Sequence, residues 1–183
     1  MKGLKTNLKE KIAFLKLKNG DLEAFGFFYD KYVKQIYRFI LLKVSNTQIA
    51  EDLTQDVFLK TWQHLVDQKS LSHFRAFIYR IARNIVIDHY RQSNRQPLPI
   101  DEVADDNLPT EEIADLDISL DVAKVKKYLA QIKPAYQEIL ILKYIEDLSF
   151  EEIAEVLQKD KNNVRVLLHR ATNKLKYIIS EGK

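Results

Sequence analysis

An uninterrupted helical pattern between Phe27 and Gln96 constrains the fold more than any other feature, because no Gly or Pro breaks it. Apolar residues recur there every three or four positions, which is the period of a helix that buries one face. Three such stripes can be traced: Phe25, Phe28, Tyr29, Tyr32, Ile36 and Ile40; Leu53, Val57, Phe58 and Leu65; and Phe74, Phe77, Ile78, Ile81 and Ile85. The whole chain of 183 residues has only four Gly and four Pro, so a turn-rich β fold is disfavoured. The sequence therefore predicts an all-α protein.

Polar residues mark the ends of the predicted helices. Asn19-Gly20 is typical of a helix end, and Asp21 of the cap that opens the next helix. Ser45-Asn46 and the polar run 67–72 separate the later helices. These breaks predict a first helical domain over residues 1–95.

The character of the chain changes abruptly after this domain. Residues 96–118 contain prolines and scattered apolar residues, and residues 96–121 carry nine Asp and Glu but no Lys or Arg. Such a composition cannot bury enough apolar surface to form a core. We expect an acidic flexible linker over 96–118 and a second helical domain over 119–183.

Capping signals organise the second domain. Pro134 stands where the first turn of a helix tolerates proline. Ser149 and Glu152 match the capping box, and Asp160 is a suitable cap for a last helix. Two short helices joined by a tight turn, the second of them basic, predict a helix-turn-helix.

Charge and composition restrict the kinds of partner and the cellular location that fit this chain. Residues 73–95 carry five basic residues against one acidic residue, and residues 158–183 carry seven against two. Such segregation indicates polyanionic partners. The chain has no cysteine, no apolar run long enough to span a membrane, and no apolar start typical of a secretion signal. A cytoplasmic location is expected.

A basic amphipathic segment precedes the first stripe. Leu4, Leu8, Ile12 and Leu15 fall on one side of a helix within residues 1–20, which contain six lysines. Such a helix can lie on a membrane. We expect it instead to pack on the first domain.

Two sets of residues resemble the bacterial RNA polymerase sigma factors. Region 2 of that family is similar to residues 25–32, to AEDLTQDVFLKTW at 50–62, and to FRAFIYRIARN at 74–84 with its continuation to Arg91. Region 4 is similar to LSFEEIA at 148–154 followed by residues 164–171. Because these two regions and a short linker make up nearly the whole chain, it resembles the extracytoplasmic-function (ECF) group.

The resemblance implies a role for each segment. A polymerase anchor, which grips a coiled coil on the β′ subunit, is expected at Asp52, Gln55, Asp56 and Leu59. Recognition and melting of the −10 promoter element are expected at Lys69, Ser70, His73, Arg75, Arg80, Arg83, Asn84 and Arg91. Recognition of the −35 element is expected at Asn162, Asn163, Arg165, Val166, His169, Arg170 and Lys174. In a major groove, Arg can pair with guanine and Asn with adenine.

The same resemblance implies the partners of the chain, and the sequence differs from the family pattern in two places. Core RNA polymerase, through its β′ and β subunits, promoter DNA and an anti-sigma factor that is often membrane-anchored are the expected partners, with no small-molecule substrate, metal or cofactor. Gln158 stands where the family usually has Gly, and Val166 and Leu167 stand where it usually has small or basic residues.

Two other functions fit parts of the sequence. A helix-turn-helix regulator that acts without polymerase would leave residues 51–62 without a role and would normally dimerise. An all-α, Mg²⁺-dependent nucleotide hydrolase would need two acidic clusters to converge on the metal. Those clusters are Glu51, Asp52 and Asp56 with Glu151, Glu152 and Glu155.

Overall fold

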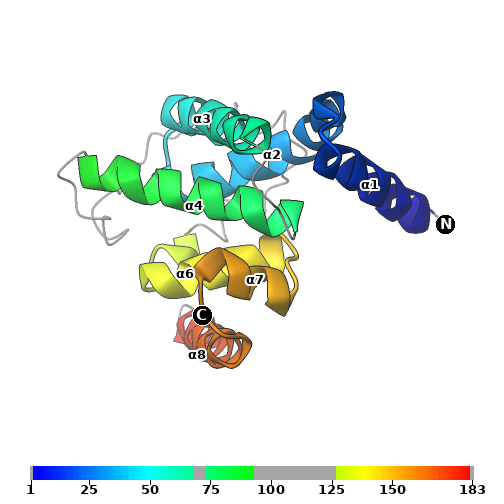
Figure 1. Cartoon of the computed structure of the whole chain (residues 1–183). Coiled ribbons are helices and arrows are strands. Elements are labelled where there is room, and N and C mark those ends of the chain that lie inside the picture. Colours follow the sequence, from blue (N-terminus) through cyan, green and yellow to red (C-terminus); the bar gives the residue numbers. More distant parts are fainter. Residues whose placement is uncertain (1, 68–72, 93–126, 182–183) are drawn as a thin grey trace. The chain divides into compact units, whose positions relative to one another are not determined.

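The computed structural model describes residues 2–67, 73–92 and 127–181, and within these ranges the chain forms helices and no strand (Figure 1). The all-α prediction is confirmed. The chain divides into two compact units, Met1–Val86 and Ile87–Lys183, each described here by itself. The predicted linker, 96–118, lies outside the described residues. In the described part of the chain, no helix has the length and apolar content needed to cross a bilayer.

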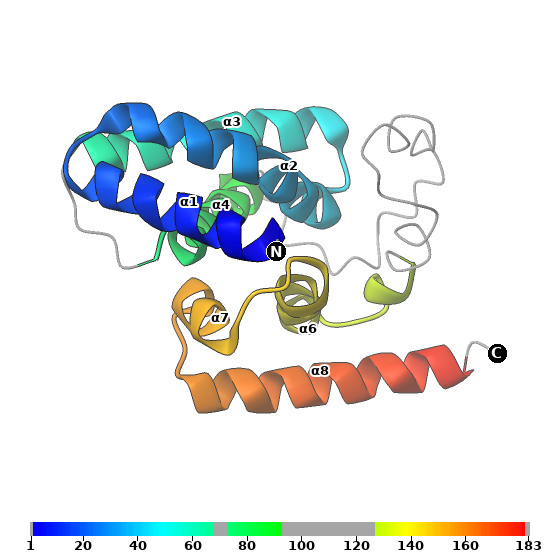
Figure 2. The ribbon, with the colours of Figure 1, turned by 90° about the vertical axis from the view of Figure 1, so that its right-hand side faces the viewer.

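The first unit is a packed set of helices. It contains α1 (Lys2–Lys18), the 3₁₀ turn η1 (Leu22–Ala24), α2 (Phe25–Val44), α3 (Thr47–Val66) and the greater part of α4 (Phe74–Gln92). Helix α3 packs along α2, and α1 packs against η1 and α2 (Figure 2). Most residues of the three predicted apolar stripes are buried, among them Phe28, Val57 and Phe77.

The predicted breaks between these helices are confirmed. Ser45 ends α2 in the left-handed conformation, with φ of 55°. The Asn46 side chain then caps α3 by accepting a hydrogen bond of 2.9 Å from the Ile49 backbone N–H. Asp21 caps the short turn η1 instead of α2 itself. Helix ends need such partners because their first N–H groups have none within the helix.

Stacked aromatic rings fill the core of the first unit. The Phe28 and Phe74 ring centroids are 4.0 Å apart, and the Tyr32 ring lies 5.8 Å from that of Phe74. Phe28 is fully buried. The prediction was wrong for Tyr29, which is 45% exposed although its ring packs 4.7 Å from that of Phe58. A tyrosine at the edge of an apolar stripe can pack its ring and still keep its hydroxyl in water.

Helix α1 packs on the domain through a face that the sequence did not predict. Ala13 and Leu17 are buried, whereas Leu8, Ile12 and Leu15 point to solvent. The expected packing of this helix on the first domain is confirmed, but it is made by the side opposite Leu8, Ile12 and Leu15. Helix α2 offers α1 polar partners as well as apolar ones, so Glu10 makes contact with it beside the buried Ala13 and Leu17.

The second unit takes in the end of α4 and, further along the chain, a helical turn at residues 127–129, three short elements and one long helix. These are α6 (Pro134–Leu140), the π-helical turn η4 (Ile141–Ile145), α7 (Phe150–Leu157) and α8 (Lys161–Glu181). Pro134 occupies the first turn of α6, as predicted. The buried Gln137 amide donates to the Leu129 and Ile132 carbonyls at 2.7 and 2.8 Å, which ties the preceding turn to α6.

Helices α7 and α8 form the predicted helix-turn-helix. Both hydrogen bonds of the capping box are present, from Glu152 N–H to Ser149 Oγ at 3.1 Å and from Ser149 N–H to Glu152 Oε2 at 2.8 Å. Gln158 adopts the left-handed conformation, with φ of 52°, where glycine is the least strained residue. The turn between α7 and α8 therefore has the left-handed conformation that glycine favours, although the residue there is Gln158. Asp160 then caps α8 by accepting from the Asn163 backbone N–H at 2.8 Å.

Candidate polymerase and nucleic-acid interfaces

The outer face of α3 combines acidic, amide and apolar side chains. Asp52, Gln55, Asp56 and Leu59, the four predicted anchor residues, are all exposed. Leu59 is 55% exposed and lies one helical turn beyond Gln55 and Asp56, near the middle of this face. We call these four residues the α3 face. An exposed leucine ringed by polar groups is the arrangement of a protein-contact surface.

The opposite side of α3 is buried, and its polar groups are satisfied. Buried Thr54 and Thr61 each donate a side-chain hydrogen bond to the helix backbone, to the Ala50 carbonyl at 2.6 Å and the Val57 carbonyl at 2.7 Å. Their hydroxyls are therefore satisfied without leaving the core. Burial of Thr54, Thr61 and Val57 on this side leaves the α3 face turned outward.

Basic residues line one side of α4. By helical register, one face holds His73, Arg80, Asn84 and Arg91. Arg75 and Arg83 lie on other sides of the helix. Lys69 and Ser70 lie outside the described residues. The structure therefore brings together four of the eight residues predicted for the −10 element.

Arg80 has a defined position on this face. Its guanidinium carbon lies 5.5 Å from the centroid of the Phe77 ring, and Phe77 is itself buried, with its ring 4.4 Å from that of His64. Such cation–π contact favours one orientation of the arginine. A cation fixed on a rigid helix suits contact with a polyanion.

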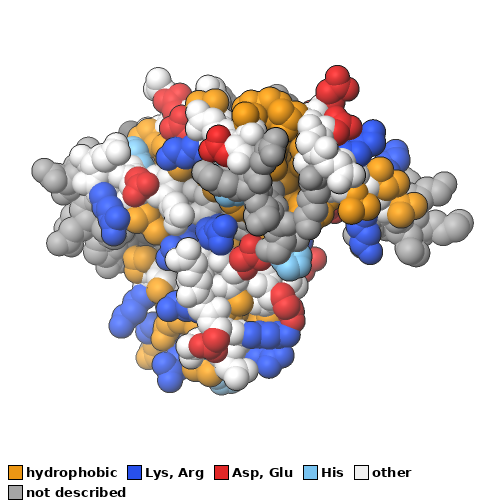
Figure 3. All heavy atoms as spheres, in the orientation of Figure 1, with side chains coloured by type: hydrophobic (Ala, Val, Ile, Leu, Met, Phe, Trp, Pro, Cys, Tyr) orange, Lys and Arg blue, Asp and Glu red, His pale blue; other side chains and the backbone are white. Residues whose placement is uncertain are grey.

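All seven residues predicted for the −35 element are exposed along α8, namely Asn162, Asn163, Arg165, Val166, His169, Arg170 and Lys174. The buried side of the helix carries Val164, Leu168 and Ala171. Lys and Arg side chains gather around α8 in the lower part of Figure 3. We call the exposed set the α8 face.

Helical register divides the α8 face into a centre and two edges. Asn162, Val166 and His169 follow one another at the centre, directly opposite the buried side. Arg165 lies at one edge and Arg170 at the other. A helix that enters a major groove brings its central side chains to the base edges and its outer ones to the phosphates.

Local contacts hold several of these side chains. The Asn163 amide donates to the Asp160 carboxylate, so this asparagine is part of the cap. His169 Nε2 lies 3.0 Å from the Asn173 amide nitrogen. The Asn163 amide would have to leave Asp160 before it could pair with adenine, which makes Asn162 the better candidate.

Arg165 lies where α7 meets α8. Its guanidinium carbon is 5.6 Å from the centroid of the Phe150 ring, and Lys143 Nζ is 5.3 Å from the same centroid. Beside it, Lys161 forms an ion pair with Glu151. The hydrogen bond from Lys161 lowers the pKa of Glu151, and the Arg165 charge adds to that effect. Sequence reasoning missed Phe150 and Lys143, because no periodic pattern links them to the exposed face.

The acidic residues of the hydrolase alternative do not share one unit. Glu51, Asp52 and Asp56 belong to α3, whereas Glu151, Glu152 and Glu155 belong to α7. Over the described ranges, no group of three or more His, Cys, Asp or Glu side chains could hold a metal ion.

Comparisons with known proteins identify both units. Sigma-70 region 2 matches residues 28–96, and Sigma-70 region 4 matches residues 123–175. The ECF RNA polymerase sigma factor ShbA of Streptomyces griseus is 34% identical over 140 residues, which are 72% of this chain and 72% of ShbA. The ECF RNA polymerase sigma factor BldN of Streptomyces coelicolor is 30% identical over 88% of this chain, but the chain spans only 62% of BldN.

These matches place the chain among the Sigma-70 factors, a family of non-catalytic transcription initiation factors. The chain belongs to the ECF group of RNA polymerase sigma factors. A solved structure has the same fold, the sigma factor RpoE of Bartonella quintana in complex with the anti-sigma factor NepR. Its TM-score is 0.64 at 22% identity, covering 85% of this chain and 96% of RpoE.

Proposed function

We propose that this chain binds core RNA polymerase through the α3 face and directs it to promoters through α4 and α8. The observation that carries the proposal is the presence, on one Sigma-70 chain, of an exposed mixed acidic and apolar helix face together with two basic ones. The polymerase supplies the chemistry, and this chain supplies sequence recognition. The polymerase-independent regulator leaves the α3 face unexplained.

Strand opening is assigned to the side of α4 that carries Arg80, Asn84 and Arg91. Taking a base out of the duplex stack costs a few kcal/mol. Cationic and aromatic side chains can offset that cost by holding the backbone and the exposed bases of a single strand. The basic line on α4 that includes Arg80 and Arg91 provides the cationic part of such a surface.

An anti-sigma factor is the proposed regulator. RpoE of Bartonella quintana shares the fold of this chain and was solved with the anti-sigma factor NepR. We extend that relation to this chain, where such a partner would cover the α3 or α8 face and so prevent binding of polymerase or promoter.

Run-off transcription from genomic fragments tests the proposed function. Core polymerase with the purified chain should give discrete transcripts that core polymerase alone does not give. Mapping their start sites should reveal a shared pair of upstream elements. Tight binding to duplex DNA without polymerase, with no new transcripts, would instead support the regulator.

Val166 should read a thymine methyl group in the −35 element. It is 49% exposed and apolar at the centre of the α8 face, and apolar side chains contact the C5 methyl of thymine in the major groove. Replacing one thymine of the −35 element by deoxyuridine removes only that methyl. At the contacted position, we expect about fourfold weaker holoenzyme binding, the size of one buried methyl group.

The alanine variant provides the control for this prediction. Val166→Ala should distinguish the thymine and uracil promoters less than wild type does, because the shorter side chain loses most of the contact with the methyl group. The idea fails if wild-type holoenzyme binds every deoxyuridine promoter as tightly as the thymine promoter. That result would leave the proposed function itself intact, since run-off transcription tests it separately.

A further inference from the structure

We propose that α1 carries a docking surface for an acidic amphipathic helix of a partner protein. Its residues are Leu8, Ile12 and Leu15, which we call the α1 stripe. They are 61%, 48% and 60% exposed and follow one another at intervals of four and three residues along one side of the helix. This surface belongs to neither the α3 face nor the two basic faces assigned to DNA.

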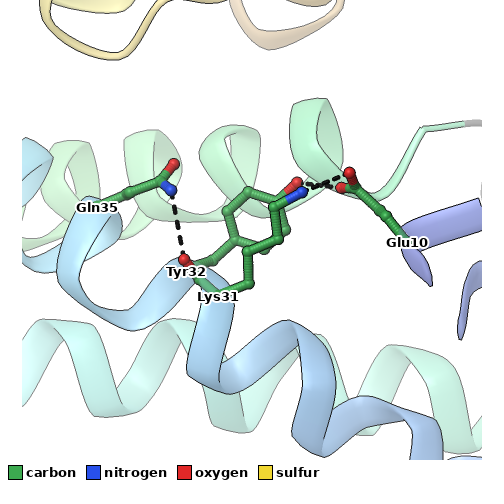
Figure 4. Close-up of polar contacts among 4 residues, drawn as sticks. All are labelled: Glu10, Lys31, Tyr32 and Gln35. Carbon is green, nitrogen blue, oxygen red and sulfur yellow. Dashed lines mark hydrogen bonds and ion pairs between the residues drawn. The ribbon is translucent and has the colours of Figure 1, made fainter. Parts of the chain in front are cut away.

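The opposite side of α1 is fixed to the domain. The Glu10 carboxylate accepts hydrogen bonds from Lys31 Nζ and the Tyr32 hydroxyl, both on α2 (Figure 4). Ala13 and Leu17 are buried on the same side. Tyr32 is itself 1% exposed and stacks in the aromatic core. The α1 stripe is therefore turned outward by specific contacts of the opposite side.

Positive charge borders the stripe. Lys11 lies along one edge, and Lys9 and Lys16 lie along the other, all three exposed. Lys16 also lies 3.8 Å from Asp21. Glu10, the acidic residue among positions 8–17, is turned inward to Lys31. Over the described side chains of α1, the exposed charges are thus all positive (Figure 3).

The width of the stripe indicates a helix as the occupant. A helix that lies in a membrane interface presents a broad apolar face with large hydrophobic residues. The α1 stripe is only one side chain wide, as is the seam between two packed helices, and its bordering lysines occupy the positions that select partners by charge. Complementarity then requires apolar residues in a matching seam, bordered by Glu or Asp.

A synthetic helix can test this surface on the full-length chain. The probe is a blocked, fluorescent peptide with leucines in a heptad seam and glutamates on both sides of it. We expect saturable binding by fluorescence anisotropy. Binding should be about 10- to 100-fold weaker to the triple variant Leu8→Gln, Ile12→Gln, Leu15→Gln, which removes the apolar contacts.

A charge exchange checks the same surface without altering the stripe. The variant Lys9→Glu, Lys11→Glu should lose affinity for the glutamate peptide and gain affinity for an otherwise identical lysine peptide. Run-off transcription with core polymerase should be unchanged in both variants, because none of the altered residues belongs to the faces assigned to polymerase or promoter.

Three results would overturn the inference. The first is that the glutamate peptide does not bind, or binds equally to wild type and to the triple variant. The second is that the charge exchange leaves the preference between the two peptides unaltered. The third is that phosphatidylglycerol vesicles, and not the peptide, bind the wild-type chain and fail to bind the triple variant, in which case α1 is a membrane-surface helix.

Discussion

Leu59→Arg should abolish binding to core RNA polymerase while leaving the chain folded. Leu59 is 55% exposed near the middle of the α3 face, so the fold does not depend on its side chain. In the complex, an arginine would be forced into a contact that now accepts a leucine. Central interface residues carry most of the binding energy, so we expect affinity to fall by about 100-fold or more. Fluorescence anisotropy of a labelled chain titrated with core polymerase measures this change.

A matched substitution separates local from general effects. Gln48→Arg introduces the same charge on the exposed side of α3, about 16 Å along the helix axis from Leu59. It should change affinity by less than about threefold, the scale of a change in a peripheral charge. Equal loss in both variants would mean that net charge, rather than the α3 face, determines binding. Circular dichroism and the thermal midpoint should match those of wild type in each case.

Local signals predicted the helix boundaries well because they depend on neighbouring residues alone. Ser45-Asn46 separates α2 from α3, and Ser149 with Glu152 forms the capping box of α7, as the sequence suggested. The buried stripes followed from the helical period for the same reason. Each of these features depends on residues no more than a few positions apart.

Features that depend on distant partners were not predictable. The apolar stripe of α1 indicated that Leu8 and Leu15 would be buried, but the helix faces the core with the other side, where Glu10 meets Tyr32. A hydrophobic pattern shows that a face can be buried, but does not show whether a partner exists for it. In the same way, the contact between Arg165 and Phe150 joins two helices and leaves no periodic trace.

From residue type alone, the sequence suggested arginine for guanine and asparagine for adenine, but it did not separate base contacts from phosphate contacts within the α8 face. Spacing placed Arg165, Val166 and Arg170 together on one exposed face, without an order among them. Burial of Val164 and Leu168 fixes how the helix is turned, and only then do Val166 and Asn162 become central and the arginines lateral. The proposed reading of the −35 element depends on this rotation.

Arg165→Ala combined with Arg170→Ala should weaken promoter binding uniformly across −35 sequences. The two arginines lie at opposite edges of the α8 face, where phosphates are the nearest groups of a bound duplex. Each lost phosphate contact should reduce the steepness of log affinity against log salt by about 0.9. The slope of the double variant should therefore be shallower than that of wild type by about 1.8. We expect affinity about 10- to 100-fold lower at moderate salt. Holoenzyme binding to labelled promoter, titrated from about 50 to 200 mM salt, measures both quantities.

Asn162→Ala is the control for the double variant, because it removes an expected base contact instead of expected phosphate contacts. Asn162 lies at the centre of the face, so its loss should relax the preference at one base pair and leave the salt slope unchanged. If the arginine variant instead lost affinity at one base pair only, with an unaltered slope, the arginines would read bases and the rotation proposed for α8 in the groove would be wrong. Both variants alter exposed residues, and the buried side of α8, which carries Val164, Leu168 and Ala171, is untouched. A change in either observable can therefore be attributed to contact with DNA rather than to loss of the fold.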